Sequence, residues 1–169
     1  MKRTIREAYE VYKQITCEYE DLDLIPEIFT DDVVGGNASY GRIRGLEAQT
    51  IFLTTAQKMG LVPEDHLWCM IDGNNLAFRA RVWGKARNQA PFVDAIGHLI
   101  FDPGRAKFCF YYGFYDSQAM ATMLSSVSTG AVDAATEGFR AVQVATKGFE
   151  SRPGFDPELQ DLMRVSHTG

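Results

Sequence analysis

Two groups of side chains in this sequence have the types and spacing needed for chemistry, and His66 is the first. His66 opens the segment His66–Ile71, whose alternating pattern predicts a strand with His66, Trp68 and Met70 on one face. An imidazole in an apolar pocket accepts or donates a proton near neutral pH, as elimination and isomerisation require. The other interpretation is a histidine at a strand start that is bonded to a loop carbonyl group.

The second group consists of Arg79, Arg81, Asp94 and His98, which lie at even spacings within two predicted strands. A turn centred at Arg87–Asn88 pairs Arg81 with Asp94 and leaves the opposite face of both strands apolar, so the charges lie on a convex outer face. A shift of one residue would instead turn the arginines inward as binders of an anion or oxyanion, oriented by Asp94. The clean binary pattern favours the first register.

The elements that must position these residues follow from the periodicity of apolar residues. A spacing of three and four predicts helices, and alternation between turn residues predicts strands. The expected helices are 4–20, 22–29 and 45–59, a short extended segment is 33–37, and the expected strands are 66–71, 76–83, 91–101 and 108–115. Short turns between the four strands imply an antiparallel meander, and helices followed by a meander make an α+β fold.

The sequence after the meander predicts a helical extension. A break at Ser125–Gly130 precedes an apolar stripe that is typical of a helix packed on its own domain or on a partner subunit. The stripe consists of Val132, Ala135, Phe139, Val142, Thr146 and Phe149. We therefore expect one domain over residues 1–124 and a C-terminal helical extension and tail over residues 125–169.

Several short segments, taken in order, resemble a known family. They are Asp21-Leu22-Asp23 before Ile28–Val33, then Arg44–Ala48, and finally Phe110–Asp116. The chain from Thr4 to Met123 is similar to SnoaL-like and ketosteroid-isomerase-like domains of the nuclear-transport-factor-2-like superfamily. This resemblance implies a cone-shaped, strongly curved antiparallel sheet that N-terminal helices close around an apolar pocket.

The resemblance also implies roles for single residues. His66 lies where dehydratases of this superfamily place a catalytic histidine, and Tyr12, or less well Tyr9, matches a helical tyrosine that donates to an oxyanion. Asn37 takes the place of the general-base aspartate of steroid isomerases, and Gly97 takes the place of their second acid. An amide cannot abstract a proton, so that mechanism is not expected, and Asn37 is predicted to contact substrate.

The pattern of the related epoxide hydrolases is also missing. Their Arg-x-Asp falls on Phe78–Trp83, which contains no acid, and Gly113 lies near the position of their water-activating aspartate. A hydrolase of that type is not expected.

Aromatic side chains on the predicted faces indicate an apolar wall with few polar groups, as in small-molecule sites. Tyr9, Trp68, Tyr112 and Phe114, with Arg79, are predicted to contact a substrate. The small residues Ala95 and Gly97 leave room for a planar ligand.

Composition narrows the function classes further. A net charge of −5 with no run of Lys or Arg longer than two argues against a nucleic-acid partner. No apolar stretch approaches the roughly 20 residues of a membrane span, and three dispersed cysteines without a signal sequence predict a cytoplasmic protein. No metal-ligand spacing or phosphate-binding glycine loop is visible, so neither a metal nor a cofactor is expected.

The function predicted from these observations is a cofactor-independent lyase or isomerase that acts on a cyclic or aromatic small molecule. His66, Tyr12, Asp94 and Arg81 are its expected catalytic residues. The alternative is a non-enzymatic ligand-binding or oligomerisation module of the same fold. In either case we expect a hydrophobic or aromatic small-molecule partner and a homodimer or higher homo-oligomer.

Overall fold

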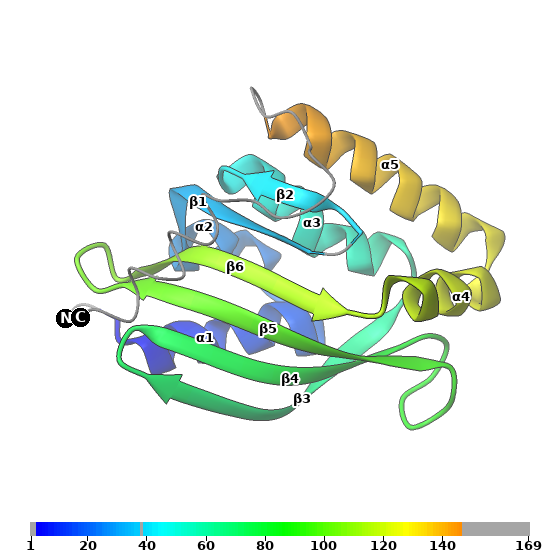
Figure 1. The fold of residues 1–169 in the computed structure, drawn as a ribbon, viewed down its shortest axis with the longest axis horizontal. Helices are drawn as coiled ribbons and strands as arrows, with labels where there is room; N and C mark the ends of the chain where they lie inside the picture. The colour runs from blue at the N-terminus through cyan, green and yellow to red at the C-terminus, as the bar shows by residue number, and fades with distance from the viewer. Residues whose placement is uncertain (1–2, 38, 147–169) are drawn as a thin grey trace.

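The computed structural model describes residues 3–37 and 39–146, which form an α+β fold (Figure 1). The elements in chain order are α1 (Ile5–Lys13), η1 (Gln14–Glu18), η2 (Leu22–Leu24), α2 (Ile25–Ile28), β1 (Phe29–Asn37), β2 (Gly41–Arg44), α3 (Leu46–Lys58), β3 (Val62–Asp72), β4 (Asn75–Trp83), β5 (Phe92–Asp102), β6 (Lys107–Tyr115), α4 (Ser117–Val127) and α5 (Thr129–Ala145). The predicted helices and the four strands of the meander are all present. Strand β2 was not predicted from the sequence.

The strands form one six-stranded sheet in the order β2-β1-β6-β5-β4-β3. Strands β3 to β6 form the predicted antiparallel meander, but β1 pairs with β6 in parallel, so the expectation of a wholly antiparallel sheet is wrong. Parallel pairing is possible here because a helix and four strands separate β1 from β6 along the chain, enough for a crossover. Strands β2 and β3 are the two edges, so the sheet is open and its cone shape stays a prediction.

Helices α1 and α3 cover one face of the sheet, which we call the inner face (Figure 1). Helix α1 begins with a capping box, in which the Thr4 hydroxyl accepts from the Glu7 amide and the Glu7 carboxylate accepts from the Thr4 amide. Its buried side chains Ala8, Tyr9 and Tyr12 pack on apolar residues of the meander. These contacts place two tyrosines over the middle of the sheet.

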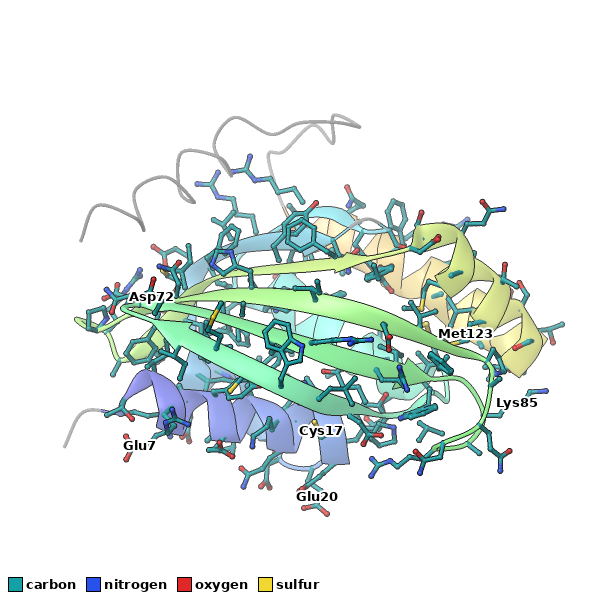
Figure 2. All side chains as sticks on the ribbon, turned by 60° about the horizontal axis from the view of Figure 1, so that its bottom comes forward. Glu7, Cys17, Glu20, Asp72, Lys85 and Met123 are labelled. Carbon is teal, nitrogen blue, oxygen red and sulfur yellow. The ribbon has the colours of Figure 1, made fainter. Side chains whose placement is uncertain are left out.

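The α1 helix continues into a π-helical turn, η1, rather than running to Glu20 as one α-helix. Such wider turns are frequent at functional sites. In a view turned by 60°, α1 with Glu7 and the turn with Cys17 run alongside β3, and Asp72 and Lys85 lie at opposite ends of β4 (Figure 2). The turn brings Thr16 against the strand that carries His66.

The C-terminal extension packs on its own domain. Asp116 caps α4 and Ser128 caps α5 by accepting from backbone amides, which explains the break between the two helices. Helix α5 lies against α3, and a β-carbon added at Gly138 would lie 2.5 Å from the Thr55 side chain. Val142 is fully buried, as the predicted stripe requires.

The other members of the stripe differ in exposure. Val132 and Phe139 are 39% and 40% exposed, whereas Thr146 is buried and Phe149 lies outside the described residues. The predicted division after residue 124 falls within α4. Among the described residues, no helix is both long and apolar enough to cross a membrane.

Candidate functional site

A cavity of about 400 Å³ lies between the inner face of the sheet and the helices α1, α3, α4 and α5. We call it the inner cavity. Its volume falls within the range of small-molecule sites. Ala95 and Gly97 line it, as the sequence predicted, and so do Tyr12 and Asn37. Several residues of α4 and α5, between Met120 and Phe139, contribute one wall, which the sequence analysis did not anticipate.

Glu64 is the one charged side chain among the described residues that line the inner cavity. It lies at the start of β3, two residues before His66, and its side chain is 19% exposed. The sequence analysis missed it because the strand was expected to begin at His66. The signal that would have revealed it is the alternation of a strand, which places Glu64 and His66 on the same face.

His66 does not line the cavity but lies directly behind Glu64. Its Nε2 is 2.8 Å from Glu64 Oε1 and 3.3 Å from Thr16 Oγ1, and its Nδ1 is 2.7 Å from the Tyr9 hydroxyl. The His66 side chain is 4% exposed and stacks on the Phe78 ring at 4.4 Å between centroids. The partners are therefore side chains, not a loop carbonyl group, and they form a carboxylate–imidazole–phenol chain.

Interactions with Cys17 and Glu64 favour the protonated form of His66. Burial disfavours the imidazolium ion, but interactions with Cys17 and Glu64 outweigh it and raise the pKa of His66 from 6.5 to about 9. At neutral pH the pair is a carboxylate hydrogen-bonded to an imidazolium ion. A protonated His66 cannot act as the base that the sequence suggested, whereas the Glu64 carboxylate faces the cavity.

This pair makes stability depend on pH. Because the pKa of His66 is raised from 6.5 to about 9, we expect its stabilising effect to be complete below pH 6.5 and to be lost as pH rises through about 9. The loss is of the order of 1–3 kcal/mol of unfolding free energy. Urea unfolding at a series of pH values measures it. His66→Gln is the control, and an equally steep decline in that variant would contradict the assignment.

Two bulges in β3 place these residues. The pairing of β3 with β4 shifts between Val62 and Asp65 and again between His66 and Trp68. The second bulge inserts Leu67, so that His66 faces inward while Trp68, opposite Arg79, faces outward and is 45% exposed. The prediction that Trp68 shares a face with His66 and contacts a substrate in the pocket is therefore wrong.

Several tyrosines line the cavity together with Glu64. Burial, with a contribution from the Glu64 charge, raises the pKa values of Tyr12, Tyr19 and Tyr111 above their usual range. These phenols therefore stay protonated and can donate hydrogen bonds. A β-carbon at Gly113 would lie 2.9 Å from the Tyr111 hydroxyl, so this glycine leaves space for the phenol. Tyr9 lies outside the cavity wall and contacts His66 instead.

The arginine–aspartate group lies on the opposite side of the sheet, which we call the outer face. Arg81 pairs with Asp94 in the predicted register, and Asp94 accepts from Arg81 at 2.7 Å and from Arg79 at 2.6 Å. These hydrogen bonds, first that of Arg81, hold the pKa of Asp94 at about 2. The predicted register is confirmed, and none of the three residues lines the inner cavity.

Tyr112 and Phe114 also lie on the outer face, where their rings pack together at 4.6 Å between centroids. Cys109 is an extra residue in the pairing of β6 with β5. Phe108 before it faces inward, and the residues after it face the opposite side from the one that simple alternation predicts. The inward side chains of β6 are therefore those of Phe108, Tyr111 and Tyr115. The expectation that Tyr112 and Phe114 contact a ligand in the pocket is corrected accordingly.

Among residues 3–37 and 39–146, no three His, Cys, Asp or Glu side chains are grouped so as to hold a metal ion. The described lining of the cavity combines one carboxylate with phenols, small hydroxyl and amide groups, and an apolar remainder. Such a lining can bind a mostly apolar molecule and move a proton on it.

No family model matches this chain, and no curated protein matches it in sequence. Solved structures do match in fold. An LEH-like epoxide hydrolase from M. tuberculosis is 18% identical with a TM-score of 0.55, covering 78% of this chain and 90% of that one. A putative SnoaL-like polyketide cyclase from Shewanella denitrificans OS-217 is 16% identical with a TM-score of 0.55, covering 72% and 96%.

An NTF2-like protein of unknown function from Cytophaga hutchinsonii ATCC 33406 is 11% identical with a TM-score of 0.57, covering 72% of this chain and 97% of that one. The likeness in fold agrees with the resemblance seen in the sequence. The chain therefore has the fold of the SnoaL-like and NTF2-like proteins.

Proposed function

We propose that the inner cavity binds a cyclic or aromatic small molecule and that Glu64 moves a proton on it, as in a cofactor-independent lyase or isomerase. The observation that carries the proposal is the Glu64 carboxylate on the cavity wall, held at 2.8 Å by a buried His66. A carboxylate in a largely apolar cavity is an effective general base when its position is set by a second group.

The proposed step begins with removal of a proton from a carbon atom next to a carbonyl group. The Glu64 carboxylate takes the proton, and the electron pair of the C–H bond moves into an enolate. A phenol of the cavity, Tyr12 or Tyr111, donates a hydrogen bond to the developing negative charge. Return of the proton to another carbon is isomerisation. In the lyase reaction the enolate re-forms the carbonyl group and a double bond, and the group on the neighbouring carbon leaves with the electron pair of its bond and takes the proton from Glu64.

The role proposed for His66 is to position Glu64. The imidazolium ion holds one carboxylate oxygen atom through Nε2, and Tyr9 holds the opposite side of the ring through Nδ1. Phe78 stacks against the same ring and prevents it from tilting. The polyketide cyclase among the structural matches supports small-molecule chemistry on this fold, although fold alone does not decide function.

Proton removal can be tested without the natural substrate. In D₂O, the wild-type protein is expected to accelerate exchange of the hydrogen atoms next to the carbonyl groups of 1-tetralone and 2-tetralone, as followed by NMR. Binding is measured separately by titration. Exchange at the buffer rate while the cavity is saturated with either ketone would overturn the proposal.

We also propose that a second copy of the chain covers the outer face. Large apolar side chains are exposed there, including Trp68 at 45%, Met70 at 62%, Ile96 at 46% and Phe114 at 50%. An apolar surface of this kind usually marks an interaction site. Arg79 and Arg81 surround Asp94 in its middle, so the face carries both charges and is complementary to a two-fold copy of itself.

The dimer is expected to dissociate when a charge is placed in that face. Trp68→Asp should turn a dimer into a monomer in sedimentation-velocity experiments, because an unpaired carboxylate would be buried at the interface. Val144→Asp is the matched control, since Val144 is 75% exposed on α5, away from the outer face. A monomeric wild-type protein, or equal dissociation of the Val144 variant, would contradict the arrangement.

A further inference from the structure

We propose that Asn37 and Tyr40 form a two-donor anchor for an acceptor oxygen atom of an uncharged ligand, at the wall of the inner cavity remote from Glu64. This inference deepens the proposed function, since it requires that the cavity binds a small molecule. It further specifies that the ligand is uncharged and how the ligand is oriented in the cavity.

The orientation of the Asn37 amide is determined by its hydrogen bonds. Its Oδ1 accepts from the backbone amides of Ser39 at 2.9 Å and Tyr40 at 2.8 Å. Because an NH₂ group cannot accept these bonds, the oxygen and nitrogen atoms cannot be exchanged. The Asn37 Nδ2 group is therefore placed by the turn that the same side chain closes.

This Nδ2 group is a buried donor that has no acceptor. Asn37 is 1% exposed and lines the cavity, and no described residue accepts a hydrogen bond from its Nδ2. Buried donors in folded proteins are nearly always paired. A ligand oxygen atom in the cavity is the partner that this geometry lacks.

Tyr40 supplies the second donor. It is 7% exposed and lines the cavity. Its hydroxyl makes no hydrogen bond of standard geometry to a described residue, although Thr55 lies near enough to lower its pKa. Burial raises its pKa to about 12, so it remains a phenol. Its ring is held between Phe52 and Phe139, at 5.3 Å and 6.0 Å between centroids, and Gln143 donates to its carbonyl oxygen.

The anchor and the carboxylate lie at opposite ends of the sheet. Asn37 ends β1 and Glu64 lies on β3, and strands β6, β5 and β4 separate the two. A ligand that reaches both therefore lies across the strands, with one acceptor oxygen atom at β1 and a separate carbonyl group beside Glu64, because the strands are spaced roughly 4.8 Å apart.

The charges of the lining select an uncharged ligand. No Lys, Arg or His side chain is found among the described lining residues, and the carboxylate of Glu64 is already paired with His66. An anionic ligand would lose its hydration without gaining a cation. The ligand class is therefore a neutral cyclic ketone, lactone or related compound.

Three probes of similar shape test this inference: the ketone 1-tetralone, the hydrocarbon tetralin, and the anion 1-naphthoate. We expect 1-tetralone to bind the wild-type protein about fivefold to tenfold more tightly than tetralin, the effect of one or two hydrogen bonds, and 1-naphthoate to bind most weakly. The side-chain NH₂ resonances of Asn37 should shift on adding 1-tetralone and stay unchanged on adding tetralin.

Asn37→Asp keeps the acceptor that closes the turn and puts a carboxylate oxygen atom, with its charge, in place of the donor, so the preference for the ketone should fall to about twofold or less. Tyr40→Phe should reduce it in the same direction, and Tyr112→Phe, on the outer face, is the control that keeps it. Equal binding of ketone and hydrocarbon to the wild type, or an unchanged preference in both anchor variants, would overturn the inference. Glu64→Gln should leave the preference for 1-tetralone over tetralin unchanged. The binding preference therefore tests the anchor, and the exchange rate tests proton transfer by Glu64.

Discussion

Replacing Glu64 by glutamine is expected to slow hydrogen exchange at the carbon next to the carbonyl group of a bound cyclic ketone by about 100-fold or more. The amide keeps the size and hydrogen-bonding shape of the side chain but cannot take up a proton. Ketone affinity should change little, because the carboxylate acts on the C–H bond rather than on the oxygen atom. NMR measures the exchange rate, and titration measures the dissociation constant.

Asp65 provides the matched control for this variant. It is the next residue of β3 but faces outward, where it accepts from the Trp83 indole at 2.7 Å. Asp65→Asn should therefore leave the exchange rate within about twofold of wild type, which is small beside the general-base effect. If Asp65→Asn and Glu64→Gln slowed exchange equally, the assignment of the base would be wrong.

Replacing Phe78 by alanine is expected to lower the free energy of unfolding by about 3–5 kcal/mol, as for other large buried aromatic residues. Phe78 is 2% exposed and packs against His66, Tyr9 and Tyr12 at 4.4–5.8 Å between ring centroids. Removing the ring enlarges the cavity and also removes the surface against which the imidazole of His66 stacks. Urea unfolding monitored by circular dichroism measures the effect.

Phe114 is the control for Phe78, because it is the same residue type on the outer face and is 50% exposed. Phe114→Ala should cost below about 1 kcal/mol of unfolding free energy in a monomer, since exposed substitutions have small effects. The comparison should be made at a low protein concentration so that association does not contribute. A smaller loss for Phe78→Ala than for Phe114→Ala would contradict the described packing.

The features that were predictable from the sequence rest on regular periodicity. Arg81 pairs with Asp94 as predicted because turn residues at Arg87–Asn88 and a clean binary pattern both select that register. The helix over Leu46–Lys58 and the four strands of the meander follow the same rule. The placement of Tyr12 in the cavity followed from its helical spacing together with the family resemblance.

The features that were missed all depend on departures from periodicity. Leu67 and Cys109 each add one residue to a strand, and each addition reverses the facing of the residues beyond it. Trp68, Tyr112 and Phe114 were assigned to the wrong face for this reason. A bulge is a tertiary compromise between twist and packing, and one sequence gives no local signal for it.

Glu64 was missed for a related reason. Pro63 precedes it, and proline is unusual within a strand, so the expected strand began only at His66. Strand β3 is an edge strand that begins at Val62, where proline is tolerated. The contribution of α4 and α5 to the cavity was also not predictable, because an apolar stripe on a helix does not identify the surface on which the helix packs.

Gly97 and Gly113 face each other across β5 and β6, and each lies beneath an aromatic side chain. A β-carbon at Gly97 would overlap the Phe78 ring, and one at Gly113 would touch the Tyr111 hydroxyl. Both rings can lie flat on the sheet only because the glycines beneath them have no side chain. A methyl group at either glycine would push the ring away from the sheet. These two glycines therefore determine the shape of the cavity wall, although a ligand need not contact them.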